Sequence, residues 1–240
     1  MEEAVTFVAY YGQKSMEMEE FIRELQHSLP QNIGFTPRPL IDIHMTVSWI
    51  PPDLLTRQEI DTLRRSGELP PPLQAPLREF AEKLDHSTVC LQFGSFDESE
   101  VMRSRGKSLH ERSFSIMGDK AVLMGWPTMD GHAEKTLAAL RSLLLQSGID
   151  HQYREVDGSM DADAYMVVGD VHSEDADETS ALSSAGQTWL ASHQLRCTLS
   201  ADDLSLVVYS DRKLPMDSCT RHMINSMLGR PSGLKNEQIP

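Results

Sequence analysis

The chain has 240 residues, of which 40% are hydrophobic and 24% are charged, and its formal net charge is −14 at pH 7. This composition is typical of a globular protein with one domain or two small ones. The acidic balance argues against duplex DNA as a partner, because contacts to phosphates supply most of the affinity for a duplex. A small phosphorylated ligand needs only a few local cations, so the net negative charge does not exclude such a ligand. No apolar run approaches a membrane span and the N-terminus is acidic, so we expect no membrane partner and a cytoplasmic location.

The spacing of apolar residues and the positions of Gly and Pro predict strands and helices along the whole chain. In the first half we expect a strand over 5–11, a helix over 15–28, a strand over 41–49, a helix over 54–65 capped by Asp53, a stiff proline spacer over 70–72, a helix over 76–84, and strands over 88–93, 114–117 and 120–126. In the second half we expect a helix over 131–148, a strand over 164–171, a helix over 175–192, a plausible hairpin of strands over 195–199 and 204–209, and a short helix over 220–228.

These two halves are roughly similar in their order of elements. Each half predicts helices over one face of a curved, mostly antiparallel sheet, which is an α+β fold. We place this domain over 1–213 and expect a C-terminal helix and a mobile tail over 214–240.

The strand over 41–49 is interrupted by a histidine and a threonine two positions apart. Residues two apart point to the same face of a strand, so His44 and Thr46 would present an imidazole and a hydroxyl side by side. This pair suits a phosphate, because the hydroxyl donates to a phosphoryl oxygen while the histidine moves a proton. The alternative is a half-buried polar pair without chemistry.

The letters His-x-Ser/Thr occur a second time at 86–88. With 9 histidines in the chain, about one such match is expected by chance, so context has to support the motif. His86 directly follows the helix predicted over 76–84, and this position favours a histidine at a helix end rather than a site.

Three segments carry sequence patterns that are more specific than the letters His-x-Ser/Thr alone. The segment 43–47 (Ile-His-Met-Thr-Val) follows an opening strand and helix, 89–96 is a strand that leads to Gly94 and Phe96, and 121–126 precedes the long helix. In these residues, and in element order over about residues 4–210, the chain resembles the two-histidine (2H) phosphoesterase superfamily, which includes RNA 2′,5′-ligase-like proteins and cyclic phosphodiesterases.

The resemblance implies two pseudo-symmetric lobes with helices on the outer faces, each with a His-x-Thr/Ser strand that faces a central cleft. It implies that His44 is one acid/base residue and that Thr46 holds a phosphate oxygen. The substrate would be a 2′,3′-cyclic phosphate or a 2′,5′-linked nucleotide or RNA end, and neither a metal nor a cofactor would take part.

The second motif should fall in the strand over 164–171, where Tyr165 and Val167 replace histidine and threonine. Valine has no hydroxyl, and a tyrosine with an ordinary pKa near 10 is a poor base at neutral pH. We expect a degenerate second half-site in which Tyr165 and Val167 line the substrate position. His172, at the exit of this strand, is the candidate for a second catalytic histidine. Five other histidines have no neighbours that suggest a site: His27, His132, His151, His193 and His222.

Two charged loops flank these strands. The basic loop is predicted to be mobile and either grips a phosphate or is merely solvated; its residues are Arg103, Arg105, Lys107 and Arg112. The acidic loop lacks the glycine and distal glutamate of a calcium loop, so we expect it to be solvated; its residues are Asp157, Asp161 and Asp163.

Three hypotheses remain open. The first is a metal-independent phosphoesterase, the second is a catalytically silent domain of the same kind that binds a nucleotide or a protein partner, and the third is an unrelated α+β domain. An imidazole close enough to His44 to share one phosphate, within about 8 Å, would favour the enzyme. A cleft with only His44 and Tyr165 would favour the binding domain.

Overall fold

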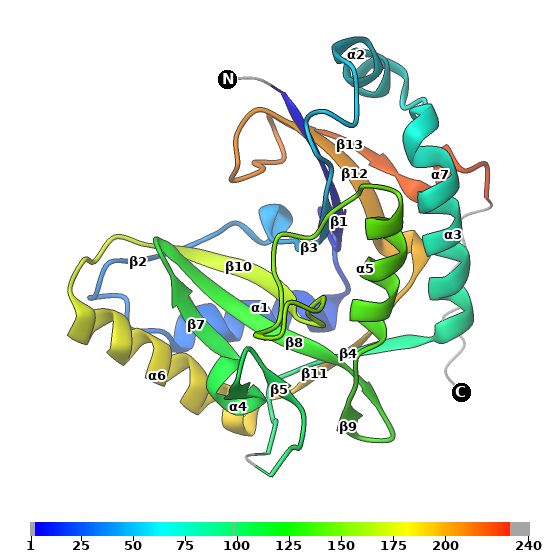
Figure 1. Cartoon of the computed structure of the whole chain (residues 1–240). Coiled ribbons are helices and arrows are strands. Elements are labelled where there is room, and N and C mark those ends of the chain that lie inside the picture. Colours follow the sequence, from blue (N-terminus) through cyan, green and yellow to red (C-terminus); the bar gives the residue numbers. More distant parts are fainter. Residues whose placement is uncertain (1–2, 98, 231–240) are drawn as a thin grey trace.

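Eleven strands join in one sheet in the computed structural model, which describes residues 3–97 and 99–230 (Figure 1). The strands of the protein are β1 Ala4–Ala9, β2 Phe35–Pro37, β3 Met45–Trp49, β4 Val89–Phe93, β5 Arg103–Ser104, β6 Lys107–Ser108, β7 Phe114–Met117, β8 Lys120–Met129, β9 His132–Ala133, β10 Ala164–Val171, β11 Leu195–Leu199, β12 Leu204–Tyr209 and β13 Thr220–Met223. The helices are α1 Met16–Ser28, α2 Arg57–Ser66, α3 Pro71–Ser87, α4 Leu109–Arg112, α5 Thr136–Gln146, α6 Ala176–Ser192 and α7 Ile224–Met227. The paired strands of the described residues are antiparallel, which confirms the predicted α+β class with a large antiparallel sheet.

The sheet is strongly curved. Its main path runs β11-β4-β8-β10-β3-β1-β12-β13, so β11 and β12 are six strand spacings apart, about 29 Å along a flat sheet. The link from Leu199 to Leu204 spans only five Cα steps, about 18 Å when fully extended. The two strands can follow one another only because the sheet bends back on itself. The predicted hairpin of β11 and β12 is therefore wrong: β11 pairs with β4, and β12 pairs with β1 and β13.

The two central strands alternate between the hydrophobic core and a cavity on the opposite face of the sheet. The core side carries Met45, Val47, Met166 and Val168. The cavity side carries His44, Thr46, Tyr165 and Val167. This period of two is the strand pattern that the sequence predicts, and it places both candidate motifs on the same face.

Helices cover the core side in two packed pairs. The pair α1 and α6 is joined by Phe21 and Trp189, whose ring centroids lie 5.1 Å apart, and α3 packs against α5 (Figure 1). Phe80 of α3 also meets Phe7 of β1, with 5.3 Å between ring centroids. The helices thus hold the central strands from one side and leave the cavity side open.

Local chemistry moves several helix boundaries from their predicted positions. Helix α2 begins at Arg57, because Thr56 and Glu59 form a capping box that Asp53 cannot form. The predicted proline spacer is wrong: α3 starts at Pro71, since prolines in a first turn lack only an N–H that would be unpaired anyway.

Two further predicted helices are shorter than expected. Strand β8 continues to Met129 and turns into β9, so α5 starts at Thr136. The helix predicted over 220–228 is the strand β13 followed by the short helix α7, and β13 extends the main sheet beside β12. The tail over 231–240 lies outside the described residues. Within the described ranges, no helix has the length and apolar composition needed to cross a membrane.

Candidate functional site

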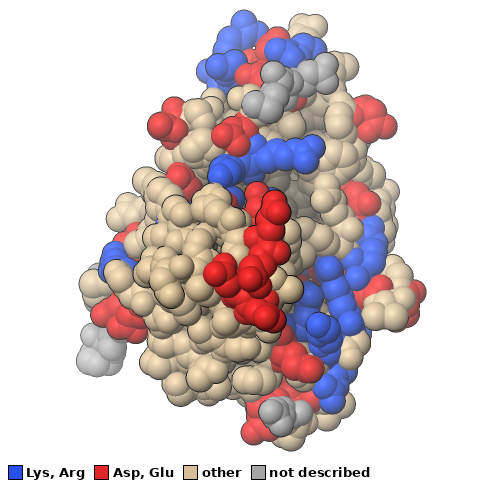
Figure 2. Space-filling model, turned by 90° about the vertical axis from the view of Figure 1, so that its left-hand side faces the viewer, with Lys and Arg blue, Asp and Glu red and all other residues tan. Residues whose placement is uncertain are grey.

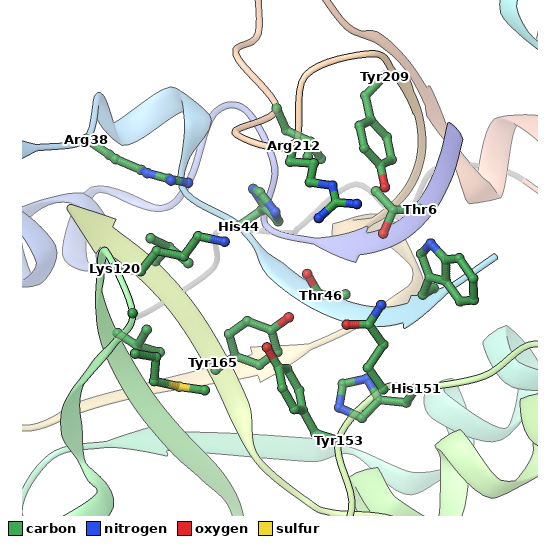
Figure 3. Close-up of a pocket in the computed structure, with 17 residues that line it drawn as sticks. Thr6, Arg38, His44, Thr46, Lys120, His151, Tyr153, Tyr165, Tyr209 and Arg212 are labelled. Carbon is green, nitrogen blue, oxygen red and sulfur yellow. The ribbon is translucent and has the colours of Figure 1, made fainter. Parts of the chain in front are cut away.

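A cavity of about 620 Å³ opens over the central strands β3 and β10 (Figure 3). Met45 pairs with Met166 where these two antiparallel strands meet, so the neighbouring residues on each strand share the opposite face. His44, Thr46, Tyr165 and Val167 all line the cavity. The structure thus brings together the four residues that the sequence assigns to the first motif and its degenerate counterpart.

His44 has one ring nitrogen fixed and the other free. The Nδ1–H of His44 donates to the carbonyl oxygen of Asp42 over 2.8 Å, and the ring packs edge-on against Tyr11, with 5.5 Å between centroids. Burial lowers the pKa of His44 to about 4, and the cations Arg38 and Lys120 act in the same direction. At neutral pH the imidazole is therefore neutral, and its Nε2 lone pair, which no described protein group engages, can accept a proton.

Tyr165 supplies a hydroxyl beside Thr46. Burial raises the pKa of Tyr165 above its ordinary range, and its hydroxyl lies near those of Thr46 and Tyr153. The phenol is thus protonated at neutral pH and can donate a hydrogen bond, whereas Val167 contributes only methyl groups. On this side the cavity contains hydroxyl groups where the resemblance implies an imidazole.

Three cationic side chains also line the cavity: Arg38, Lys120 and Arg212. Figure 3 shows them gathered around His44, and no Asp or Glu of the described residues lines the cavity. Asp170 lies behind Arg38, with 2.9 Å between Oδ1 and Nη2, and fixes that guanidinium. Figure 2 shows a hollow in one face of the molecule with basic side chains at its margin, beside a stripe of acidic ones. The positive charge of the side chains that line the cavity favours the binding of an anion.

His151 also lines the cavity, and the sequence did not indicate it. Asp150 anchors this segment to β3, because its carbonyl oxygen accepts from the Trp49 amide over 2.8 Å and from the Ser48 hydroxyl over 2.6 Å. The His151 side chain is 2% exposed, and its Nε2 lies 3.2 Å from Oδ1 of Asp161. Burial first, and then the nearby Arg141, lower the pKa of His151 to about 4, although Asp161 opposes the shift. A histidine in an irregular segment gives no periodic signal in the sequence.

Two residues of the acidic loop, Asp161 and Asp163, are buried, contrary to the sequence prediction, whereas Asp157 is exposed as predicted. Asp161 is fully buried and forms ion pairs with Arg141 at 3.0 Å and Arg105 at 2.9 Å. Asp163 is 2% exposed and accepts hydrogen bonds from three side chains: Ser104, Arg112 and Trp126. Arginines from distant parts of the chain compensate these carboxylates, and alternate acidic residues alone could not reveal this.

Arg141 connects the buried acidic residues to the motif strand. Its guanidinium is fully buried and donates to the carbonyl oxygens of Thr46 and Val47 over 3.1 and 3.0 Å. The same side chain pairs with Asp161. Helix α5 therefore fixes both β3 and the segment that faces His151.

The predicted basic loop forms a two-stranded antiparallel hairpin, β5–β6. Arg105 turns inward, where its guanidinium lies 4.6 Å from the centroid of the Tyr153 ring. Tyr153 lines the cavity, so Arg105 supports the wall from behind. Arg103 and Lys107 are exposed, and the structure does not bring them to the cavity.

His172 is not brought to the cavity either. It is exposed at the end of β10, and its backbone N–H donates to the carbonyl oxygen of Gly34 over 2.9 Å. His86 lies in the last turn of α3, which confirms its interpretation as a histidine at a helix end.

No family model matches the chain, and no curated protein matches it.

Proposed function

We propose that the cavity binds a phosphate ester and that His44 transfers a proton during its hydrolysis. The observation that carries the proposal is the charge of the lining: a chain of net charge −14 places three cations and no carboxylate of the described residues around His44. Cationic groups and hydroxyl donors bind the non-bridging oxygens of a phosphate. The substrate class is a 2′,3′-cyclic phosphate or a 2′,5′-linked nucleotide or RNA end, as the resemblance to 2H phosphoesterases implies.

The strand order supports two pseudo-symmetric lobes. The unit β1–α1–β3 places its second strand at the centre of the sheet, and the unit β8–α5–β10 does the same from the other side. Along the sheet, β1 lies outside β3 as β8 lies outside β10. This arrangement supports Tyr165 and Val167 as the counterparts of His44 and Thr46.

In the proposed reaction, Nε2 of His44 takes the proton of an attacking water molecule, while Thr46 and the cations hold the phosphate. A pKa of about 4 makes His44 a weak base in the empty cavity. A bound phosphate anion raises this pKa, because a nearby negative charge favours the imidazolium. The proposed chemistry needs no metal, and no carboxylate of the described residues lines the cavity to ligate Mg²⁺.

Hydrolysis of the four 2′,3′-cyclic mononucleotides in excess chelator tests this function. We expect turnover by the wild type and a loss of roughly 10²–10⁴-fold in kcat in His44→Gln, which removes the base. His222→Gln is the matched control, because His222 is partly buried beside Gly67 and does not line the cavity. Equal turnover in His44→Gln and the control would contradict the proposal.

The second candidate function is a catalytically silent domain that binds a nucleotide or a protein partner. The replacement of histidine and threonine by Tyr165 and Val167 favours it, because this half of the cavity lacks the expected imidazole. Calorimetric binding of a nucleotide monophosphate without turnover of any cyclic nucleotide would favour this candidate over the enzyme.

A further inference from the structure

His151 and Asp161 form a buried pair at the edge of the cavity. Both side chains are at most 2% exposed, and 3.2 Å separate Nε2 of His151 from Oδ1 of Asp161. Nε2 forms no hydrogen bond of ordinary geometry with Oδ1, so the carboxylate acts on the ring through its charge, which stabilises an imidazolium when one forms. The pair is a buried imidazole beside a buried carboxylate.

The other ring nitrogen of His151 is available to a ligand. Nδ1 has no hydrogen-bond partner among the described residues, and it is not sealed from solvent as Nε2 is. His151 lines the cavity, so Nδ1 is the nitrogen that the cavity reaches. One nitrogen faces a carboxylate and the other faces the site.

The position of His151 relative to the motif is suitable for one shared phosphate. The ring centroids of His151 and Tyr165 lie 6.4 Å apart, and the hydroxyl of Tyr165 lies near that of Thr46. Figure 3 shows His44 and His151 on opposite sides of Thr46. A cavity of 620 Å³ would be about 11 Å across as a sphere, so a nucleotide phosphate held by Thr46 can lie between the two imidazoles.

We propose that His151, held by Asp161, is the second proton-transfer residue of this cavity, an assignment that rests on the proposed hydrolysis. In the reaction, a water oxygen forms a bond to phosphorus and the bond from phosphorus to one ribose oxygen breaks. The bound phosphate anion and Asp161 favour the imidazolium form of His151, which carries a proton on each ring nitrogen. His44 takes the water proton at Nε2, and the His151 imidazolium gives its Nδ1 proton to the departing ribose oxygen. The products are a phosphomonoester and a free ribose hydroxyl, and the two histidines then exchange protons with solvent.

The test combines turnover of 2′,3′-cyclic mononucleotides with an NMR titration of the histidine rings by inorganic phosphate. We expect His151→Gln to lower kcat by roughly 10²–10⁴-fold with little change in KM, while His222→Gln keeps wild-type kcat. In the wild type, added phosphate should move the ring resonances of both His44 and His151. In Asp161→Asn, the ring resonances of His151 should titrate at a lower pH than in the wild type, because the charge that favours the imidazolium is lost.

Each outcome separates this inference from the proposed function. If the wild type hydrolyses the substrates and His151→Gln is as active as the His222→Gln control, the assignment of His151 is overturned and the proposed function stands. If the wild type does not hydrolyse them, the proposed reaction fails and His151 is overturned as a catalytic residue. The phosphate titration is done on the wild type, so it shows independently of any variant whether the anion binds near His151. If only the ring resonances of His44 move, the phosphate binds away from His151 and the assignment is overturned.

Discussion

Lowering the pH from 7 to 5 should destabilise the protein through its two cavity histidines. His44 and His151 each have a pKa of about 4 in the folded state, against an ordinary value of 6.5 in the unfolded chain. Between these values the unfolded state binds more protons than the folded state. The stabilising contribution of these two neutral histidines is therefore fully present above about pH 6.5 and is lost as the pH falls toward 4.

The magnitude follows from the linkage relation. Each histidine contributes a slope of about 1.4 kcal/mol per pH unit between the two pKa values. From pH 7 to pH 5 this amounts to about 2 kcal/mol for each histidine and about 4 kcal/mol for both. A domain stability of 5–15 kcal/mol makes such a loss easy to measure.

Urea unfolding at the two pH values, followed by tryptophan fluorescence to which the buried Trp126 contributes, provides the assay. His44→Gln and His151→Gln should each lose about 2 kcal/mol less than the wild type over this interval, since glutamine does not titrate. His222 also has a lowered pKa and adds a loss of the same sign, so only differences between variants are informative. The exposed His27→Gln is the control and should follow the wild type. A wild-type loss that persists unchanged in both cavity variants would refute the burial of neutral imidazoles.

Two other predictions follow from the charged groups around the cavity. Arg141→Met removes one of the two guanidinium partners of the buried Asp161, together with the donor to the Thr46 and Val47 carbonyls, so it should cost about 3–5 kcal/mol in urea unfolding; a cost below 1 kcal/mol would contradict the buried pair. Lys120→Met should weaken the binding of a nucleotide monophosphate roughly tenfold by calorimetry, because a charge-assisted contact is lost, whereas Lys107→Met on the exposed hairpin should leave the Kd unchanged. Equal effects of the two lysine variants would place the phosphate elsewhere.

The parts of the site that depend on local patterns could be predicted from the sequence. The alternation around His44 and Thr46 is a local pattern of period two. The position of Tyr165 and Val167 in the strand after helix α5 follows from the order of the elements. The structure places all four residues on one cavity.

The parts that depend on distant partners could not be predicted. Asp161 and Asp163 belong to a polar loop by composition, yet their partners Arg141, Arg105 and Arg112 come from other segments and make burial possible. His151 is part of the site only because of these partners. Likewise, strands as close in sequence as β11 and β12 usually form a hairpin, and only the curvature of the whole sheet separates them.

The pairing of β12 with β1 has a consequence for how the protein folds. Strand β1 lies between β3 and β12, and Ala4 pairs with Tyr209 from the far end of the described chain. During synthesis, one edge of β1 stays without its native partner until β12, about 200 residues later, has emerged. Pairing at such a sequence separation incurs a large loop-closure entropy before any contact compensates it, which is typical of slow folding. Strand β1 is thus synthesised long before its pairing is completed, and its exposed edge is a segment that a nascent chain needs to shield from other chains.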